Sequence, residues 1–379
     1  MRRDVPYQAM HYHQILDTAE LGGGNLYALA IAERLVATGC SAPVWCGSDG
    51  PAVAEAIQRR LTIHRFDQGR LKRGSLSSLV QLASLGWRWR QWGGLVHVHS
   101  HLLYGFLRPA WRLARVRTVA HVHIETDTEA YRWAFRHPPD MIVTCAAFLA
   151  QQLDAALPLA LRQQTRIVAV PNAVDTTRFF PADRAQAKER VQAPTDRPLI
   201  LLAANLARTK GHLTALHALH WLRERGSDAE LWFAGIERGG STTFTDELKQ
   251  RITALRLDDR VQLLGQRADM PELMRAADVV ILPSVSEGLP LTLLEAQATG
   301  TPVIAAPTAG IPEIIHDGDT GFLVPADDAA GYGQRLHELF RTPALATRLA
   351  EAALQQVRAK HTFERLFQQL RSLYIEVGG

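Results

Sequence analysis

Apolar residues fall in short runs along the chain, separated by longer segments in which apolar positions recur at helical spacing. Short apolar runs bounded by turn residues predict buried strands, and helical spacing between them predicts covering helices. The first half predicts strands that end near residue 17 and at 42–46, 61–66, 95–99, 118–123 and 141–145, and helices at 26–38, 52–60, 76–92, 104–113, 131–135 and 147–157. This alternation is typical of a parallel sheet covered on both faces.

The second half repeats the pattern. It predicts strands at 199–203, 230–234, 261–264 and 279–282, a helix after His212, one that begins at Asp269 and one at 291–298. Between the halves, a strand runs into Pro171-Asn172, a pair that favours a turn, and polar residues follow up to Pro198. We therefore expect two α/β domains, at 1–180 and 181–360, followed by an amphipathic C-terminal helix at 361–379. Ligands of such sheets bind at the carboxyl ends of the strands.

Length and composition agree with this division. A chain of 379 residues is longer than one compact core usually holds, and 47% hydrophobic with 21% charged residues is typical of soluble globular proteins. The sequence has no run of eighteen apolar residues and no apolar signal-peptide core, so we expect a cytoplasmic protein. Cys40, Cys46 and Cys145 lack metal-type spacing and are expected to be packed as thiols.

The stretch from Leu282 to Asp328 carries the strongest indication of chemistry. Glu287 and Glu295 stand at the two ends of a loop and the predicted helix 291–298, whose first backbone N–H groups have no partner within the helix. Such a helix start favours an anion such as phosphate. A second interpretation stays open, in which both acids are solvated charges near a helix start.

Two further strand-to-helix turns have anion-binding character. Gly23 and Gly24 lie in a glycine turn after the first strand, where a diphosphate can approach the backbone, although a plain tight turn has the same composition. Asn205, Arg208 and Lys210 precede the helix after His212, and Lys210 can act as a point charge on phosphate. Arg208 can equally be an exposed surface arginine.

Histidines occur as His-x-His pairs at the predicted strand ends. The pairs are His11/His13, His97/His99 with His101, and His121/His123. Histidines with a period of two can chelate a metal, but they can also bond to backbone partners, and no carboxylate or cysteine spacing completes a zinc site. We therefore expect no metal and no cofactor.

The motifs after residue 286 resemble those of the retaining GT-B glycosyltransferases of family 4, also called glycosyl transferases group 1. The matching segments are EGLPLTLLEA at 287–296, GTPV at 300–303, GIPE at 310–313 and GDTGFLV at 318–324. Residues 171–179 resemble the family's P-N-G-V-D-x-x-x-F signature with Ala173 in place of glycine, and Asn205 stands where the family has arginine. The resemblance implies two Rossmann-like, doubly wound domains facing a cleft, with the C-terminal helix crossing back to the first domain.

The resemblance also implies the reaction and the residues that perform it. We expect a retaining glycosyltransferase that moves a sugar from a UDP- or GDP-linked donor to a saccharide acceptor, which we expect to be lipid-linked, in cell-surface polysaccharide synthesis. Alternatives are a soluble small-molecule acceptor or a non-catalytic homologue that binds nucleotide sugars. The implied catalytic residues are Glu287, Lys210 and His123, and the implied donor-binding residues are Glu295, Arg208, Gly23, Gly24, Leu291, Thr292 and Asn205.

The sequence disfavours one other enzyme class and one class of partner. An NAD-dependent oxidoreductase needs a Rossmann fingerprint, and the glycines at 22–24 are not followed by the required third glycine. No nucleic acid is expected as a partner.

Charge and tryptophan content suggest a membrane partner. The net charge of +4 divides unevenly, because residues 1–180 hold 20 Lys and Arg against 13 Asp and Glu, whereas the remainder holds 22 against 25. The predicted helix 76–92 places Leu76, Leu79, Val80, Ala83 and Trp87 on one face, while Leu82, Leu85, Trp89 and Trp92 widen it. Arg70, Lys72 and Arg73 precede this helix, and Arg88 and Arg90 stand beside its tryptophans. This pattern favours peripheral binding to the anionic inner face of the plasma membrane, and a core helix with a solvated basic edge is the alternative.

Overall fold

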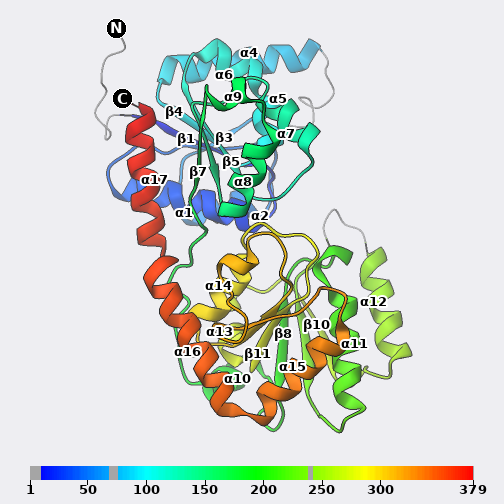
Figure 1. Cartoon of the computed structure of the whole chain (residues 1–379). Helices are drawn as coiled ribbons and strands as arrows, with labels where there is room; N and C mark the ends of the chain where they lie inside the picture. The colour runs from blue at the N-terminus through cyan, green and yellow to red at the C-terminus, as the bar shows by residue number, and fades with distance from the viewer. Residues whose placement is uncertain (1–9, 68–75, 238–241, 379) are drawn as a thin grey trace. The chain divides into compact units, whose positions relative to one another are not determined.

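A computed structural model describes residues 10–67, 76–237 and 242–378 of the chain. The chain divides into two compact units, the first formed by Met1–Pro171 with Leu366–Gly379 and the second by Asn172–Arg365. Each unit is built around a parallel β-sheet, as the alternating pattern predicts (Figure 1).

The first unit contains a seven-stranded parallel sheet in the order β3-β2-β1-β4-β5-β6-β7. Its strands are β1 (Tyr12–Ile15), β2 (Val44–Cys46), β3 (Ile63–Arg65), β4 (Leu95–Val98), β5 (Arg117–Val122), β6 (Met141–Thr144) and β7 (Arg166–Ala169). Strands β1, β2, β4 and β6 are buried along their whole length. Most of their residues are therefore apolar, although β1 also buries His13 and Gln14, and β4 buries His97.

Helices connect the strands of the first unit. They are α1 (Gly23–Ala37), α2 (Pro51–Gln58), α4 (Leu76–Trp92), α5 (His101–Phe106), α6 (Arg108–Ala114), α7 (Thr128–Phe135), α8 (Ala147–Ala156) and α9 (Leu159–Arg162). The last helix of the chain, α17 (Phe363–Gly378), joins this unit from residue 366 onward. Its Tyr374 packs against Tyr12 of β1 and bonds to His97 of β4.

Two helix predictions in the first unit need correction. The helix expected at 104–113 is two helices, α5 and α6, because Pro109 lies in the first turn of α6 and cannot continue the preceding helix. The helix expected at 26–38 begins at Gly23, so that Gly23 and Gly24 belong to its first turn and not to a turn before it.

The second unit contains a six-stranded parallel sheet in the order β10-β9-β8-β11-β12-β13. Its strands are β8 (Leu199–Ala203), β9 (Glu230–Ala234), β10 (Val261–Gly265), β11 (Val279–Leu282), β12 (Val303–Ala305) and β13 (Phe322–Leu323). Its helices are α10 (Arg184–Val191), the 3₁₀ turn η2 (Arg208–Lys210), α11 (His212–Arg223), α12 (Thr243–Ala254), α13 (Met270–Ala276), α14 (Leu291–Ala298), the 3₁₀ turn η4 (Ile311–Glu313), α15 (Ala329–Arg341) and α16 (Pro343–Lys360). After Gly310 the chain forms only the short turn η4.

The boundary between the units lies at Pro171/Asn172 and not at 180/181. Residues after Pro171 are held by the second unit: Asn172 donates to the Leu289 carbonyl at 2.7 Å, and Arg275 donates to the carbonyls of Arg178 and Phe180. The second boundary falls at 365/366 and not at 360/361, because Val174 pairs with the backbone at His361 and Phe363.

Four histidines at the ends of β4 and β5 form a stack in the first unit, with His97, His99 and His121 buried and His123 half-buried. The ring centroids of His97 and His99 lie 4.1 Å apart, and those of His121 and His123 lie 4.0 Å apart. Burial lowers the pKa of His97 and of His123 to about 3 and holds the pKa of His99 and of His121 well below 6.5. The stack is therefore neutral at physiological pH.

Because of this stack, the free energy of unfolding should decrease as the pH falls. Because the folded-state pKa is lowered, the unfolded chain binds more protons below pH 6.5, and stability present at pH 7.5 is lost as pH falls. Each such histidine contributes about 1.4 kcal/mol per pH unit in this window. Urea unfolding in the presence of a chelator should therefore give a clearly lower midpoint at pH 5.5 than at pH 7.5.

Two variants test the origin of this effect. His121→Phe should reduce the pH dependence, whereas His316→Gln, at an exposed position in the second unit, should leave it unchanged. A midpoint that does not move between pH 7.5 and 5.5 would contradict the expectation.

Candidate active site

Two strand-to-helix loops of the second unit approach each other at the carboxyl edge of the sheet. One loop links β8 to α11 and the other links β11 to α14. Gly211 has φ +75°, and a Cβ at this position would lie 2.0 Å from the carbonyl oxygen of Pro283. The hydroxyl of Ser284 donates to the Thr209 carbonyl at 3.0 Å, and the amide of Val285 donates to the same carbonyl at 2.9 Å. Glycine is required here because the two backbones are in direct contact.

This contact brings Lys210 and Glu287 together. The Nζ of Lys210 lies 2.7 Å from Oε1 of Glu287 and donates more weakly to the Ser286 carbonyl at 3.4 Å. The side chains are 24% and 11% exposed, so the pair is largely removed from solvent. The interpretation of Glu287 as a freely solvated acid is therefore wrong for this structure.

Helix α14 begins next to this pair, at Leu291, with Pro290 as its N-cap. Proline has no N–H, so the first backbone donors of the helix are those of Leu291 and Thr292. The hydroxyl of Thr292 donates to the carbonyl of Ala203, the last residue of β8, at 3.0 Å. This bond fixes the start of α14 against the end of β8, where the helix dipole favours an anion.

Glu295 lies one turn further along α14. Burial raises its pKa to about 7, and the guanidinium of Arg178 opposes this rise. A carboxyl group in this range can both accept and donate a hydrogen bond near neutral pH. Arg178 was not among the predicted site residues, and its sequence position, 117 residues before Glu295, gives no indication of this proximity.

Arg208 and Asn205 occupy the loop before Lys210. The guanidinium of Arg208 donates to Glu247 of α12 at 2.7 Å and lies 5.5 Å from the ring centroid of Phe244. Its side chain is 66% exposed, and exposed ion pairs contribute only about 0–1 kcal/mol, so exchange of Glu247 for an anionic ligand costs little. Asn205 is half-buried just after β8, beside the backbone of Gly235.

In the first unit, the structure brings His123 to the glycines at the start of α1. A Cβ at Gly24 would lie 3.2 Å from Cδ2 of His123. The Nε2 of His123 lies 3.4 Å from Nδ1 of His99. Gly24 thus leaves room for the imidazole beside the first turn of α1, and Gly23 precedes it in the same turn.

Two asparagines that the sequence analysis did not assign to the site hold its loops. The Nδ2 of Asn25 donates to the carbonyls of Glu20 at 2.7 Å and Thr18 at 2.9 Å, which fixes the loop before α1. The bond from Asn172 to the Leu289 carbonyl does the same for the loop before α14. The Pro171-Asn172 pair was a visible signal, but it was interpreted only as a turn.

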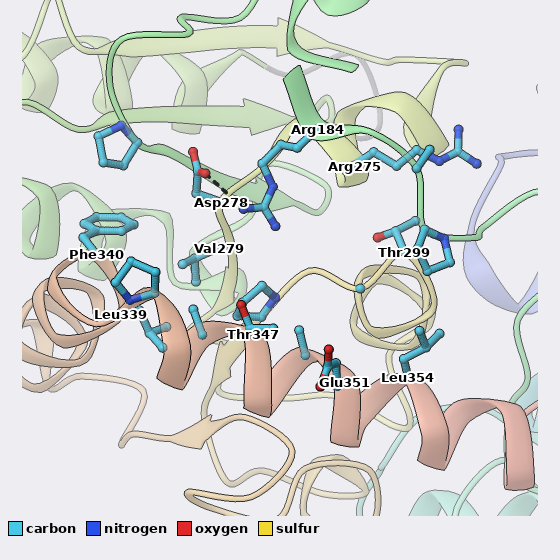
Figure 2. A pocket seen from close by; sticks show the side chains of 18 residues that line it. Arg184, Arg275, Asp278, Val279, Thr299, Leu339, Phe340, Thr347, Glu351 and Leu354 are labelled. Atoms are coloured by element: carbon cyan, nitrogen blue, oxygen red, sulfur yellow. Dashed lines mark hydrogen bonds and ion pairs between the residues drawn. The ribbon is translucent and has the colours of Figure 1, made fainter. Parts of the chain in front are cut away.

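A pocket of about 640 Å³ in the second unit lies away from these residues (Figure 2). Its lining includes Pro198, Val279 and Pro302, which stand at the amino ends of β8, β11 and β12. The ion pair of Arg184 and Asp278, 3.3 Å long, crosses this pocket. The pocket therefore lies at the amino edge of the sheet, opposite the edge that carries Lys210 and Glu287.

Comparison with known proteins identifies both halves of the chain. The model of Glycosyltransferase Family 4 matches residues 21–178, and the model of Glycosyl transferases group 1 matches residues 183–356. The D-inositol 3-phosphate glycosyltransferase of Corynebacterium efficiens is 27% identical over 391 residues, covering 94% of this chain and 90% of that protein. The enzyme of the same name from Streptomyces avermitilis is 27% identical and covers 89% of this chain and 79% of its own length.

Solved structures share the fold. The Anabaena protein HepE in complex with UDP-glucose has a TM-score of 0.85 at 20% identity, with 96% of this chain and 99% of that chain covered. Sucrose-phosphate synthase from Thermosynechococcus elongatus has a TM-score of 0.81 at 19% identity, with 97% and 99% covered. These likenesses agree with the GT-B fold that the motifs predict. The chain is a glycosyltransferase and belongs to the family that the Glycosyltransferase Family 4 and Glycosyl transferases group 1 models describe.

Proposed function

We propose that this glycosyltransferase moves a sugar from a nucleoside diphosphate donor to a soluble, polyhydroxylated small molecule, with retention at the anomeric carbon. The observation that carries the donor half of the proposal is the Lys210–Glu287 pair at the start of α14. A UDP-linked donor agrees with the UDP-glucose named for the Anabaena structure. A small acceptor agrees with the name that the curated relatives carry, D-inositol 3-phosphate glycosyltransferase.

The reaction breaks the bond between the anomeric carbon and the diphosphate oxygen and joins that carbon to an acceptor oxygen. The acceptor proton leaves with the diphosphate, whose negative charge grows as the bond breaks. Lys210 and the amides of Leu291 and Thr292 are fixed donors at one helix start, where they stabilise such charge without reorganisation. Glu287 holds the Lys210 ammonium and orients sugar hydroxyls, Glu295 accepts from the ribose, and His123 contacts the sugar as a neutral imidazole.

A transfer assay tests the proposal directly. Purified protein is incubated with UDP- and GDP-linked sugars, with inositol, inositol phosphates or simple sugars as acceptors, and release of nucleoside diphosphate is followed. We expect release that depends on one donor and on a soluble acceptor, and NMR of the product should show the donor's anomeric configuration. Turnover only with a lipid-linked acceptor would contradict the soluble acceptor, and an inverted product would contradict retention.

Lys210→Ala and Glu287→Ala should each lower kcat/KM by about 10²- to 10³-fold, because each removes a fixed charged contact at the reacting groups. Glu338→Ala is the matched control, since it breaks an exposed ion pair with Arg335 on α15, a helix that carries none of the site residues. Thermal melting of all variants separates loss of chemistry from loss of fold. A folded Lys210 or Glu287 variant with less than about a threefold loss would remove the pair from the mechanism.

Helix α4 favours a second location for the acceptor, at a membrane surface. It packs Leu82, Leu85 and Trp89 inward and lies beside α6 in the first unit (Figure 1). The opposite face stays exposed, with Leu76 at 79%, Leu79 at 59%, Val80 at 66% and Trp87 at 61%. None of the described helices is long and apolar enough to cross a membrane.

This exposed face, together with Arg88 and Arg90, fits an anionic bilayer surface. Tryptophan suits the interface, and each basic residue near it contributes about 1 kcal/mol. The basic residues at 70, 72 and 73, which the sequence analysis included, lie outside the described residues. Membrane attachment of the first unit would suit a lipid-linked acceptor.

Co-sedimentation with phosphatidylserine vesicles tests this surface. We expect binding at low salt that falls about fivefold for each of Arg88→Glu and Arg90→Glu, since 1 kcal/mol corresponds to that factor. Leu79→Ser and Trp87→Ser should also weaken it, whereas Ile57→Ser, at a 62% exposed position on α2, should not. Equal sedimentation of all these variants, or none by the wild type, would exclude the α4 surface.

A further inference from the structure

Three buried histidines of the first unit offer one ring nitrogen each within a small volume. His97 belongs to β4, His99 follows β4 directly, and His121 belongs to β5. Their candidate ligand atoms all lie within 4.8 Å of one another. The exposed fractions are 0% for His97, 3% for His99 and 0% for His121, so the group, called here the histidine cluster, lies inside the unit.

The hydrogen bonds of the cluster leave nitrogen lone pairs unused. Nδ1 of His97 lies 2.6 Å from the Tyr374 hydroxyl, and Nε2 of His99 lies 2.9 Å from Oε1 of Gln14. Among the described residues, Nε2 of His97 and both ring nitrogens of His121 have no hydrogen-bond partner. A buried polar nitrogen without a partner costs about 1–3 kcal/mol, so three in one place call for an explanation.

We propose that the histidine cluster binds one divalent transition-metal ion of the Zn²⁺ class. Neutral imidazole is the common protein ligand for Zn²⁺, Co²⁺ and Ni²⁺. The bonds to Tyr374 and Gln14 are the outer contacts that orient metal-bound histidines, because each occupies one ring nitrogen. Nε2 of His97 is left for the ion, whereas Nδ1 of His99 lies 3.4 Å from Nε2 of His123 and would exchange that contact for the ion. The cysteine and carboxylate spacing that the sequence analysis looked for is not needed by a site made of three histidines.

The fourth ligand of such a site would come from Tyr27. Its ring centroid lies 4.9 Å from that of His121, and its hydroxyl is buried without a hydrogen-bond partner among the described residues. Three neutral imidazoles leave the charge of a dication uncompensated in a buried setting, and a phenolate oxygen supplies one negative charge. Binding would then release one proton from the Tyr27 hydroxyl.

Metal binding requires the imidazole rings to turn as well as to approach one another. Tetrahedral Zn²⁺ holds nitrogens at about 2.0–2.1 Å and so at about 3.4 Å from one another. The observed limit is 4.8 Å, and the ring planes of His97 and His121 are only 10° apart, so these rings must rotate until their in-plane lone pairs converge on the ion. The ion would join β4 and β5 and, through His97 and Tyr374, would fix α17 of the first unit (Figure 1). Its role is structural, since the donor half-site lies in the second unit.

Titration with Co²⁺ alone tests the site, after dialysis of the full chain against a chelator. We expect one equivalent to bind, with the strong visible absorption of tetrahedral Co²⁺, and Zn²⁺ to displace it and raise the melting temperature. Because the cluster is buried, the ion is added both to native protein and during refolding. His97→Gln and His99→Gln should lose the absorption. His13→Gln, a substitution of a buried histidine bonded to Gly93 outside the cluster, should keep it.

Tyr27→Phe decides the matter if the histidine variants do not fold, since it removes only an unpartnered hydroxyl. It should weaken Co²⁺ binding at least tenfold and change the spectrum. Wild-type protein that binds no Co²⁺ under either condition overturns the proposal. The proposal is also overturned if every folded variant of the cluster, and Tyr27→Phe, still binds one equivalent of Co²⁺.

Discussion

The contact between the backbones of Gly211 and Pro283 is the constraint on which the arrangement of Lys210, Glu287 and the start of α14 depends. A side chain at position 211 would collide with the Pro283 carbonyl, so the two loops meet only if this residue is glycine in the left-handed region. With the loops in contact, the ammonium of Lys210 donates to the carboxylate of Glu287, and the hydroxyl of Thr292 donates to the carbonyl of Ala203 at the end of β8. Each charged or polar group of the half-site is therefore positioned by backbone packing, and the ion pair follows from it.

The same loops show why a parallel sheet suits this chemistry. All six strands of the second unit run in one direction, so β8 and β11 end at one edge and their loops must share it. At this edge, α14 presents first-turn amides, and Lys210 adds a full positive charge to their partial ones. Glu287 keeps the ammonium in place, which limits the rearrangement needed when an anion arrives.

The sequence predicted the order and type of most strands, because buried parallel strands read as apolar runs bounded by turns. It also placed Glu287, Lys210 and the start of α14 in one site through motif resemblance. Spacing alone could not pair Lys210 with Glu287, since 77 residues separate them and only the crossing of two loops joins them. It also did not reveal that Arg208 bonds to Glu247, because an exposed guanidinium selects its partner from whichever acid the next helix presents. The division of the helix at 104–113 was foreseeable from Pro109 and was missed.

Helix α4 and the histidine cluster show a different limit of sequence patterns. In α4, apolar residues cover more than one face, and periodicity cannot say which face the core takes. The structure buries Leu82, Leu85 and Trp89 and leaves Leu79, Val80 and Trp87 exposed. Contiguous exposed apolar surface of this kind is typical of interaction sites. In the cluster, His-x-His spacing places alternate residues on one side of each strand, but only pairing of β4 with β5 brings two such rows together. Packing alone does not account for either feature. A polar outer face on α4 and aliphatic side chains in place of the histidine cluster would suit the fold equally well. We infer that such surplus chemistry, exposed apolar side chains in one case and buried unpaired nitrogens in the other, is where this chain differs from a minimal scaffold for glycosyl transfer.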